Sequence, residues 1–290
     1  MPSSLIDFRD WTKPDLEALL DLSFQLEKDK PTTEATGTTA ALLFFEPSTR
    51  TRMSFELACY QESVACTLLT GKVGTSLEKG ETAEDTILNV SSMGPDLLVI
   101  RTGSDLDLWS LQKKVPQPIL NAGWGTFAHP TQALLDVRTL MAKGLPLEKI
   151  RILIVGDVKH SRVASSHFEL SRKLGYKIAV CSPRVFRPTY DVPVFGDLEE
   201  GLEWANVVMT LRFQVERHHN GLQNDDWENY QVNSQRLKAW QNRGWLMHPG
   251  PVNYGIELAE DVRDYKQNLI LEQVHSGLWL RRACLKRMIR

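Results

Sequence analysis

The chain has 290 residues, 42% of them hydrophobic and 24% charged, which is an ordinary globular composition at a length that suits two domains. Its 34 basic and 36 acidic side chains give a formal charge of −2, which excludes a global basic field that would bind nucleic acid or a membrane surface. Any anion site must therefore be made by a local arrangement.

The four cysteines are scattered and lack CxxC spacing, which predicts neither a zinc site nor a disulfide framework. Cys59 and Cys181 stand in apolar runs, where we expect buried, reduced thiols. No run approaches the ~20 apolar residues of a membrane-spanning helix, and the first residues lack the pattern of a secretory signal. We expect a soluble, cytoplasmic protein.

The first half of the chain predicts strands that alternate with helices. A helix is expected over residues 11–28, where Thr12 and Pro14 form a good helix start. Short apolar runs predict strands at residues 40–45, 65–69, 97–101 and 118–121, with helical patterns between them. This alternation indicates a parallel sheet with helices on both faces.

A second alternating series begins after a long helix expected over residues 130–143. Its expected strands are residues 151–155, 177–181, 207–211 and 244–247, and its expected helices are residues 162–174, 198–204 and 271–289. The boundary between the halves falls at about residues 130–150. We therefore predict an α/β protein with two doubly wound parallel-sheet domains joined by helices.

The segment AALLFFEPSTRTRMSFELACY, residues 40–60, predicts a strand, a loop and a helix, with Ser48, Thr49, Arg50, Thr51 and Arg52 at the helix start. Free backbone N–H groups and the positive end of the helix dipole favour an anion there. Hydroxyls add donors, and an arginine can grip two phosphate oxygens. An ordinary N-cap with surface arginines is the alternative. Five consecutive donor-bearing residues favour a phosphate site.

Other polar groups of the first half also follow predicted strands or begin helices. Arg101 ends the strand LLVIR, although it could simply be solvated. His129 and Gln132, three residues apart on one helix face, could donate to a carbonyl oxygen and orient an NH₂ group, or His129 could only cap the helix. Ser76 and Lys79 stand in a glycine-flanked loop, where a lysine is usually a solvated charge.

In the second half, Arg162 follows the strand end GDVKHS, which lacks the GxGxxG pattern of a dinucleotide site. Arg212 and Gln214 share one face after the next strand, unless Arg212 only neutralises Glu216. The turn HPGPVN contains Gly250 and Pro251, and its prolines leave carbonyls free to accept from an amide. The two arginines suit carboxylates.

At these residues the sequence resembles the transcarbamylase family, in its aspartate branch. The matching pieces are FEPSTRTRMSFE, SLEKGET, VIR, HPTQALLD, residues 157–162, LRFQVER and HPGPVN, in family order across both halves. STRTR and HPTQ are specific to transcarbamylases. SLEKGET with LRFQ favours the aspartate branch, since the ornithine branch more typically shows HPCQ and HCLP.

The resemblance implies a carbamoyl-phosphate-binding domain over residues 1–135, on which a C-terminal helix of about residues 274–290 packs back, and an aspartate-binding domain over residues 145–273. It implies transfer of the carbamoyl group of carbamoyl phosphate to the amine of L-aspartate, which gives N-carbamoyl-L-aspartate and phosphate in de novo pyrimidine biosynthesis. It implies no cofactor and no metal, and leaves regulatory or dihydroorotase-type subunits open.

The resemblance also implies a role for each matching residue. Carbamoyl phosphate would be held by Ser48, Thr49, Arg50 and Thr51. The catalytic set would be Arg50, Thr51, Arg101 and His129, the last three polarising the carbamoyl C=O. Its NH₂ would be oriented by Gln132, Gly250 and Pro251, and aspartate bound by Arg162, Arg212 and Gln214. Ser76 and Lys79 would come from a neighbouring subunit, which requires a homotrimer.

Three residues depart from the family pattern: Trp124, Phe127 and Tyr254. They leave the loop before His129 and the second domain open to question. One alternative is a transcarbamylase for ornithine, although a cationic substrate should not face Arg162 and Arg212. Another alternative is a catalytically silent paralogue that acts as a binding subunit. The departure from the family pattern at Trp124 is the feature that supports it. A dinucleotide oxidoreductase would fit the fold, but this sequence lacks the glycine fingerprint of that class.

Overall fold

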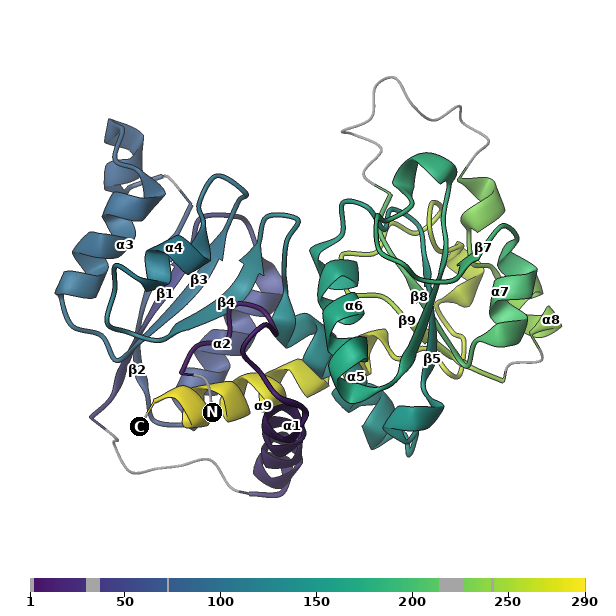
Figure 1. Ribbon diagram of the computed structural model, residues 1–290, viewed down its shortest axis with the longest axis horizontal. Helices are drawn as coiled ribbons and strands as arrows, with labels where there is room; N and C mark the ends of the chain where they lie inside the picture. Colours follow the sequence, from purple (N-terminus) through teal and green to yellow (C-terminus); the bar gives the residue numbers. More distant parts are fainter. Residues whose placement is uncertain (1–2, 30–36, 72, 214–226, 241–242, 290) are drawn as a thin grey trace. The chain divides into compact units, whose positions relative to one another are not determined.

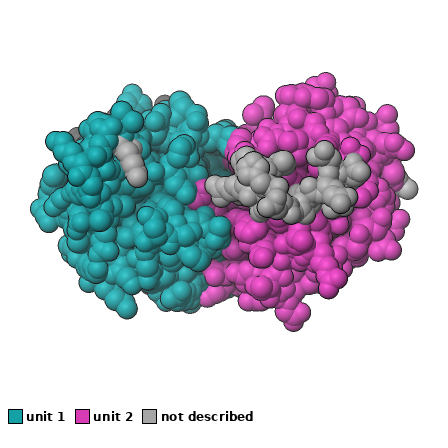
Figure 2. Space-filling view, turned by 90° about the horizontal axis from the view of Figure 1, so that it is seen from above, with its two compact units in different colours: residues 1–138, 274–290 teal, residues 139–273 magenta. Residues whose placement is uncertain are grey.

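The computed structural model describes residues 3–29, 37–71, 73–213, 227–240 and 243–289, which fall into two compact units. Unit 1 comprises residues 1–138 and 274–290, and unit 2 comprises residues 139–273 (Figure 2). Each unit holds its own parallel sheet, which confirms the predicted α/β class with two doubly wound domains.

The sheet of unit 1 has four strands in the order β2-β1-β3-β4, all parallel. They are β1 (Thr39–Phe44), β2 (Ala65–Thr70), β3 (Leu97–Thr102) and β4 (Ile119–Trp124). The chain moves outward from β1 to β2 on one side and from β3 to β4 on the other, so the order reverses between β1 and β3. Ligands of open α/β sheets bind beyond the carboxyl ends of strands at such a switch point.

Helices cover both faces of this sheet. The helices of unit 1 are α1 (Lys13–Lys28), α2 (Thr49–Gln61), α3 (Ala83–Ser92), α4 (Leu108–Gln112), the first part of α5 (Pro130–Ala142) and most of α9 (Ile270–Met288). Alternate residues of β1 and β3, such as Leu43 and Ile100, pack against α3 and α4. Figure 1 shows α2 and α9 on the opposite side of the sheet from α3, so the C-terminal helix returns to unit 1 as predicted.

The sheet of unit 2 has five parallel strands in the order β7-β6-β5-β8-β9. They are β5 (Arg151–Val155), β6 (Lys177–Cys181), β7 (Val194–Phe195), β8 (Val207–Thr210) and β9 (Trp245–Met247), joined by α6 (Arg162–Leu174), α7 (Leu198–Trp204) and α8 (Ser234–Ala239). The strand order reverses between β5 and β8. Each unit therefore has one switch point.

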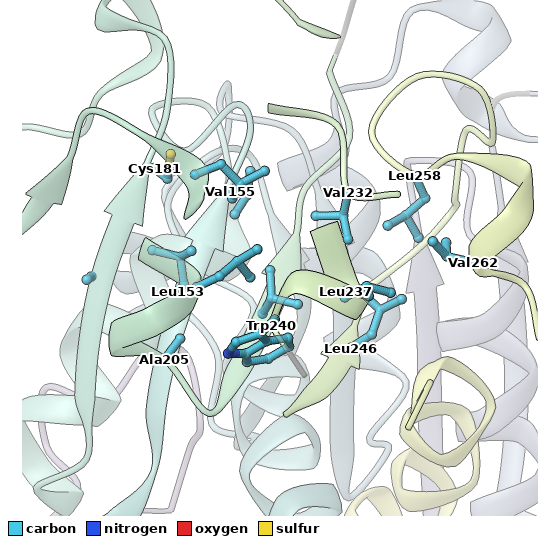
Figure 3. Packing of buried hydrophobic residues seen from close by; sticks show 14 residues of the cluster. Leu153, Val155, Cys181, Ala205, Val232, Leu237, Trp240, Leu246, Leu258 and Val262 are labelled. Atoms are coloured by element: carbon cyan, nitrogen blue, oxygen red, sulfur yellow. The ribbon is translucent and has the colours of Figure 1, made fainter. Parts of the chain in front are cut away.

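The core of unit 2 gathers apolar side chains from the strands and from α7 and α8 (Figure 3). Trp240 is buried among them, and Gly244 lies directly beneath its ring. A Cβ at Gly244 would stand 1.9 Å from the indole, so only glycine lets β9 begin this close to Trp240. This packing fixes β9 beside β8, and with it the position of the HPGP turn that follows.

Most predicted elements are confirmed. The helix at residues 162–174 and the strands at residues 151–155 and 177–181 agree at both ends. Cys59 and Cys181 are buried free thiols, as expected, whereas Cys66 is exposed. In the part of the chain that the structure describes, no helix combines the length and apolar character needed to cross a bilayer. β7 and α8 had no counterpart in the sequence prediction, whereas α4 falls under the general expectation of helical patterns between the first-half strands.

Candidate active site

The first turn of α2 lies at the switch point of unit 1, immediately beyond β1. Its N-cap residue is Ser48, with φ −162° and ψ 110°, and the Ser48 side chain makes no capping hydrogen bond. The turn contains Thr49, Arg50 and Thr51 and has no acidic residue. Its backbone N–H groups and the positive helix end are therefore available to an anion.

Two other helices of unit 1 begin differently. At α1, the Thr12 side chain accepts from the backbone N–H of Asp15, and the Asp15 carboxylate accepts in return, which is a complete capping box. At α3, the Thr82 hydroxyl accepts from the backbone N–H of Asp85, at 3.0 Å. Both first turns hold acidic residues. The acid-free, uncapped start of α2 is thus a property of its local sequence and is not shared by α1 and α3.

The two arginines of this turn have different surroundings. Arg52 forms an ion pair with Glu56, one helical turn further on, at 3.5 Å. Arg50 makes no hydrogen bond or ion pair with any described residue, and partial desolvation lowers the pKa of its guanidinium. Thr51 is buried at 6% exposure. Of the two, Arg50 is the arginine that can receive an anion without giving up a partner.

Arg101 lies opposite Phe44 across the β1–β3 pair, so the two strand ends bring it to the same edge as α2. Its side chain is only 12% exposed, with Nε 3.7 Å from Oε2 of Glu46 and Nη1 donating to the carbonyl of Ala122 at 3.3 Å. The alternative of a merely solvated arginine is therefore wrong. Glu46 holds the guanidinium in place beside the switch point.

His129 and Gln132 are both buried at the start of α5, where the backbone carbonyl of His129 accepts from Gln132. The side-chain NH₂ of Gln132 donates to Oδ1 of Asp136 at 2.9 Å. Because Asp136 occupies the amide nitrogen, the Gln132 carbonyl oxygen becomes the group that can accept from a ligand NH₂. This geometry fits the role predicted for Gln132.

The loop before His129 is closed by the residues that depart from the family pattern. Trp124 and Ala128 are bridged by backbone hydrogen bonds, and the Trp124 indole donates to the carbonyl of Leu106 at 2.6 Å. The ring of Phe127 lies 4.8 Å from that of Trp124, measured between centroids. Trp124 therefore acts as a structural residue of unit 1 that sets the approach to His129.

Ser76 and Lys79 lie on the short 3₁₀ helix η1 (Ser76–Lys79), which contacts α3. Both are exposed. Neither side chain makes a hydrogen bond or ion pair with the α2, β3 and α5 residues among those that the structure describes. Within one chain, the hydrogen bonds and ion pairs of the described residues therefore do not connect these two side chains with the other first-half residues.

The edge of unit 2 begins with Gly156 and Asp157, which follow β5. Gly156 has φ +114°, and a Cβ there would lie 2.6 Å from the carbonyl oxygen of Leu211, so the β5 and β8 ends can approach only because this residue is glycine. Asp157 is buried, and both its carboxylate oxygens contact Nδ1 of His160, at 2.9 and 3.0 Å. The pair fixes the turn that leads into α6.

Arg162 and Arg212 are brought to this same edge. Arg162 is the first residue of α6, and Arg212 stands two residues beyond Thr210, whose partner in the sheet is Val155 of β5. Both side chains are half-buried. Two guanidinium groups at one switch point suit a ligand with carboxylates. Gln214 lies outside the described residues.

The turn with Gly250 and Pro251 follows β9, which neighbours β8. It contains a cis peptide bond between these residues, and the backbone N–H of Gly250 donates to Nδ1 of His248 at 2.7 Å. Nε2 of His248 lies 3.1 Å from Oε1 of buried Glu257, so histidine and glutamate together hold the turn. Further along, Tyr254 packs under the guanidinium of Arg263, 3.6 Å from the ring centroid.

Sequence reasoning missed the acidic residues that hold polar side chains at the two strand edges. These are Glu46 at Arg101, Asp136 at Gln132, Asp157 at His160 and Glu257 at His248. Their signal was present, because each lies inside or beside a matching motif. No group of three or more His, Cys, Asp or Glu side chains among the described residues could hold a metal ion.

Comparison with known proteins assigns the chain to a class. Residues 3–142 match the family model for the carbamoyl-P binding domain of aspartate/ornithine carbamoyltransferase, and residues 148–288 match the model for its Asp/Orn binding domain. The chain belongs to the aspartate/ornithine carbamoyltransferase family, which confirms the resemblance. The residue ranges and ligands predicted for the two domains stay predictions.

Two sequence relatives carry the same particular name. The chain is 38% identical to the aspartate carbamoyltransferase catalytic subunit of Koribacter versatilis, over 99% of this chain and 97% of that protein. It is 39% identical to the subunit of the same name from Thermus aquaticus, over 98% and 97% of the two chains. These similarities favour the aspartate branch.

Solved structures are similar over the full chain. Aspartate transcarbamoylase from Trypanosoma cruzi, in complex with carbamoyl aspartate and phosphate, is 26% identical with a TM-score of 0.87 and covers 99% of this chain and 96% of its own. Ornithine carbamoyltransferase from Thermus thermophilus is also 26% identical, with a TM-score of 0.88 and complete coverage of both chains. Backbone shape therefore does not separate the two branches.

Proposed function

We propose that this chain transfers the carbamoyl group of carbamoyl phosphate to the amine of L-aspartate, giving N-carbamoyl-L-aspartate and phosphate in de novo pyrimidine biosynthesis. The observation that carries the proposal is the uncapped, acid-free first turn of α2, with Arg50 unengaged among the described residues. It supplies donors for phosphate at the switch point of unit 1, while Arg162 and Arg212 supply cations for carboxylates at that of unit 2.

The proposed roles are those that the family resemblance implies for the matching residues. Ser48, Thr49, Arg50 and Thr51 bind the phosphate, and Gln132 accepts from the carbamoyl NH₂ together with the carbonyls at Gly250 and Pro251. Thr51, Arg101 and His129 stabilise the oxyanion that develops when the aspartate amine attacks the carbamoyl carbon, and one such donor typically contributes about 2.7–4 kcal/mol. The amine is the nucleophile and phosphate is the leaving group, so no covalent protein intermediate is required. The departing phosphate can take the amine proton.

Aspartate rather than ornithine is the proposed acceptor, because paired arginines repel a cationic side chain and attract a dicarboxylate. The relatives named above agree with this choice. A carbamoylation assay with aspartate and ornithine side by side tests it. We expect product only with aspartate. Turnover with ornithine alone would assign the chain to the other branch, and binding of phosphate without any turnover would support a silent binding subunit.

We propose a homotrimer in which Ser76 and Lys79 complete the site of a neighbouring copy. The outer face of α2 exposes Met53 at 50%, Leu57 at 49% and Tyr60 at 82%, which recur at helical spacing. The neighbouring edge strand β2 is largely exposed as well. An apolar helix face beside an open strand edge favours association. Native mass spectrometry should give three chains, and a monomer would contradict the proposal.

Hybrid assemblies test whether the sites are shared. Neither Lys79→Ala nor Arg50→Ala should be active alone. After mixing in equal amounts and reassembly, roughly a quarter of the sites should pair an intact Arg50 with a neighbour's intact Lys79. Activity at about that fraction of the wild-type value supports the shared site. No recovery, with trimers present, would mean that each chain forms its own site.

The proposed location is the cytoplasm, where carbamoyl phosphate and aspartate would be available as soluble metabolites. Regulatory or dihydroorotase-type subunits are compatible with a catalytic trimer. Co-purification of the chain from its native source, followed by mass analysis of the assembly, distinguishes an isolated trimer from a larger complex.

A further inference from the structure

Helix α9 carries two adjacent buried arginines whose surroundings differ. Arg282 is 1% exposed, and its Nε donates to Oε1 of Glu62 at 2.6 Å, so its charge is neutralised inside unit 1. Arg281 is 3% exposed, and its one hydrogen bond to a described residue runs from Nη1 to the Ser54 hydroxyl at 2.7 Å. Its Nε is buried without a hydrogen-bond partner, and no carboxylate of the described residues lies within 4.0 Å of its guanidinium nitrogens.

A buried cation with so few partners is costly to the folded state. The face of Phe55 offers partial compensation, since the guanidinium carbon of Arg281 lies 5.2 Å from the ring centroid. The hydroxyl and the ring are neutral. The protein therefore keeps a poorly compensated positive charge in the interior of unit 1, which stability alone does not explain.

The location of this charge connects it with the candidate active site. Ser54 and Phe55 belong to α2, about one turn beyond Arg50 and Thr51. Burial lowers the pKa of Arg281 to about 10, while the charge of Asp136 raises it and that of Arg50 lowers it further. Arg281 is thus close enough to respond to Arg50, which would bind phosphate, and to Asp136, which holds Gln132.

A glycine on α9 makes room for the guanidinium. A Cβ at Gly277 would lie 2.6 Å from Nη1 of Arg281 and 3.3 Å from Cδ2 of Leu135. Glycine is otherwise unfavourable in a helix interior. Gly277 and Arg281, one turn apart, therefore form a matched pair in which the glycine admits the buried cation.

We propose that Arg281 is a positioning residue for the phosphate of the substrate: it fixes the first turn of α2 through Ser54 and keeps positive charge behind Arg50. The inference rests on the proposed function. In the absence of ligand, the guanidinium groups of Arg50 and Arg281 repel each other. A bound phosphate dianion offsets this repulsion, so the repulsion in the unliganded protein increases its affinity for the anion.

The test compares Arg281→Met with Arg282→Met. Calorimetry with inorganic phosphate gives Kd, steady-state kinetics give KM for each substrate, and urea unfolding gives the midpoint. For Arg281→Met we expect the phosphate Kd and the carbamoyl phosphate KM to rise about ten- to hundredfold, as displaced binding groups do. The aspartate KM should change by less than about twofold. The midpoint should stay or rise, because an apolar side chain of similar size replaces a poorly paired charge.

Arg282→Met is the matched control and should behave in the opposite way. It leaves Glu62 buried with only the Lys286 ammonium, 3.9 Å away, so the unfolding midpoint should fall while the phosphate Kd stays unchanged. Arg281→Lys retains the charge and should recover part of the phosphate affinity. Gly277→Ala displaces the guanidinium without removing it, and should weaken phosphate binding in the same direction as Arg281→Met.

A folded Arg281→Met protein with unchanged phosphate Kd would overturn the inference. If that variant fails to fold, Gly277→Ala decides by the same two measurements. The proposed function is judged separately, by carbamoyl transfer in the wild-type chain. A wild-type protein that makes no carbamoyl aspartate refutes that function, whereas an active wild-type with an indifferent Arg281→Met variant refutes only the role of Arg281.

Discussion

The helices that begin at the two switch points, α2 in unit 1 and α6 in unit 2, start in different ways. At α6 the Ser161 hydroxyl accepts from the backbone N–H of Ala164, at 3.2 Å. At α2 the Ser48 side chain makes no such bond. The same residue type thus closes one helix end and leaves the other open.

The difference matches the anions that the two edges are proposed to bind. Phosphate has several oxygens that can accept from backbone N–H groups and an arginine together, which suits an open helix end. A carboxylate matches the two-pronged geometry of arginine, so unit 2 can close its helix and rely on Arg162 and Arg212. On this proposal, two sheets of the same class would distinguish phosphate from carboxylate by the way one helix begins.

The largest expected effect is at Arg50. Arg50→Ala should lower kcat by about 100- to 1,000-fold, because the phosphate loses its bidentate partner and the transition state a positive charge. Arg52→Ala is the control, since Arg52 already pairs with Glu56 and should change kcat little. Steady-state turnover at saturating substrates measures both. Equal losses in the two variants would contradict the assignment.

Arg212→Ala tests the proposed carboxylate site of unit 2, as Arg50→Ala tests the proposed phosphate site of unit 1. It should raise the KM for aspartate by about ten- to hundredfold, the usual value of a hydrogen bond between charged groups, while the phosphate Kd stays unchanged. Arg172→Ala is the matched control, because it removes an exposed positive charge near the end of α6, away from the strand edge. If aspartate dependence is unaltered, the carboxylate site lies elsewhere.

Ser48→Asp would convert the open helix end into a closed, acidic one. The new carboxylate should cap α2 and repel phosphate, so the phosphate Kd should rise about tenfold while α2 becomes slightly more stable. Ser48→Ala removes only a hydroxyl and should have a smaller effect. Calorimetric titration with inorganic phosphate compares them. Unchanged affinity in Ser48→Asp would show that the helix end does not bind the anion.

The smallest effect concerns a cap away from both edges. Thr82→Ala removes the hydrogen bond to the backbone N–H of Asp85 and should cost about 1 kcal/mol of unfolding free energy, with turnover unchanged. Ser48→Ala, which loses no capping bond, should leave stability nearly as it was. Urea titrations of the two variants measure the contrast. Equal losses would mean that Ser48 caps α2 in solution.

The sequence pattern predicted the long elements well, because a strand with an apolar run and a helix with a periodic apolar face are both visible in the sequence. Strands such as Arg151–Val155 and helices such as Arg162–Leu174 carry enough residues to show a period. The two residues of β7 form a strand only because they pair with β6, and α8 is too short for a helical repeat to be visible. Strand order is set by long-range pairing, which no local pattern records.

The candidate site was predictable where its chemistry stands in motifs. Ser48 to Thr51, Arg101, His129 and Gln132 lie at or after the carboxyl ends of β1, β3 and β4, as the motifs indicated, and their joint role in one site stays a prediction. The acidic partners were not predicted, since a carboxylate inside a motif looks like any solvated acid until its contact is known. Arg281 and Arg282 were invisible for a stronger reason. They are neighbours of the same type, and only their three-dimensional surroundings separate them.

The family match and the folding unit divide this chain in different places. The second match runs to residue 288, whereas α9 from residue 274 onward belongs to unit 1, where it covers Ser54 and Glu62. A fragment cut at the sequence border would expose the part of unit 1 that α9 covers and leave the buried carboxylate of Glu62 without Arg282. Grafting the amino-terminal half between relatives should therefore succeed only when the tail is exchanged with it.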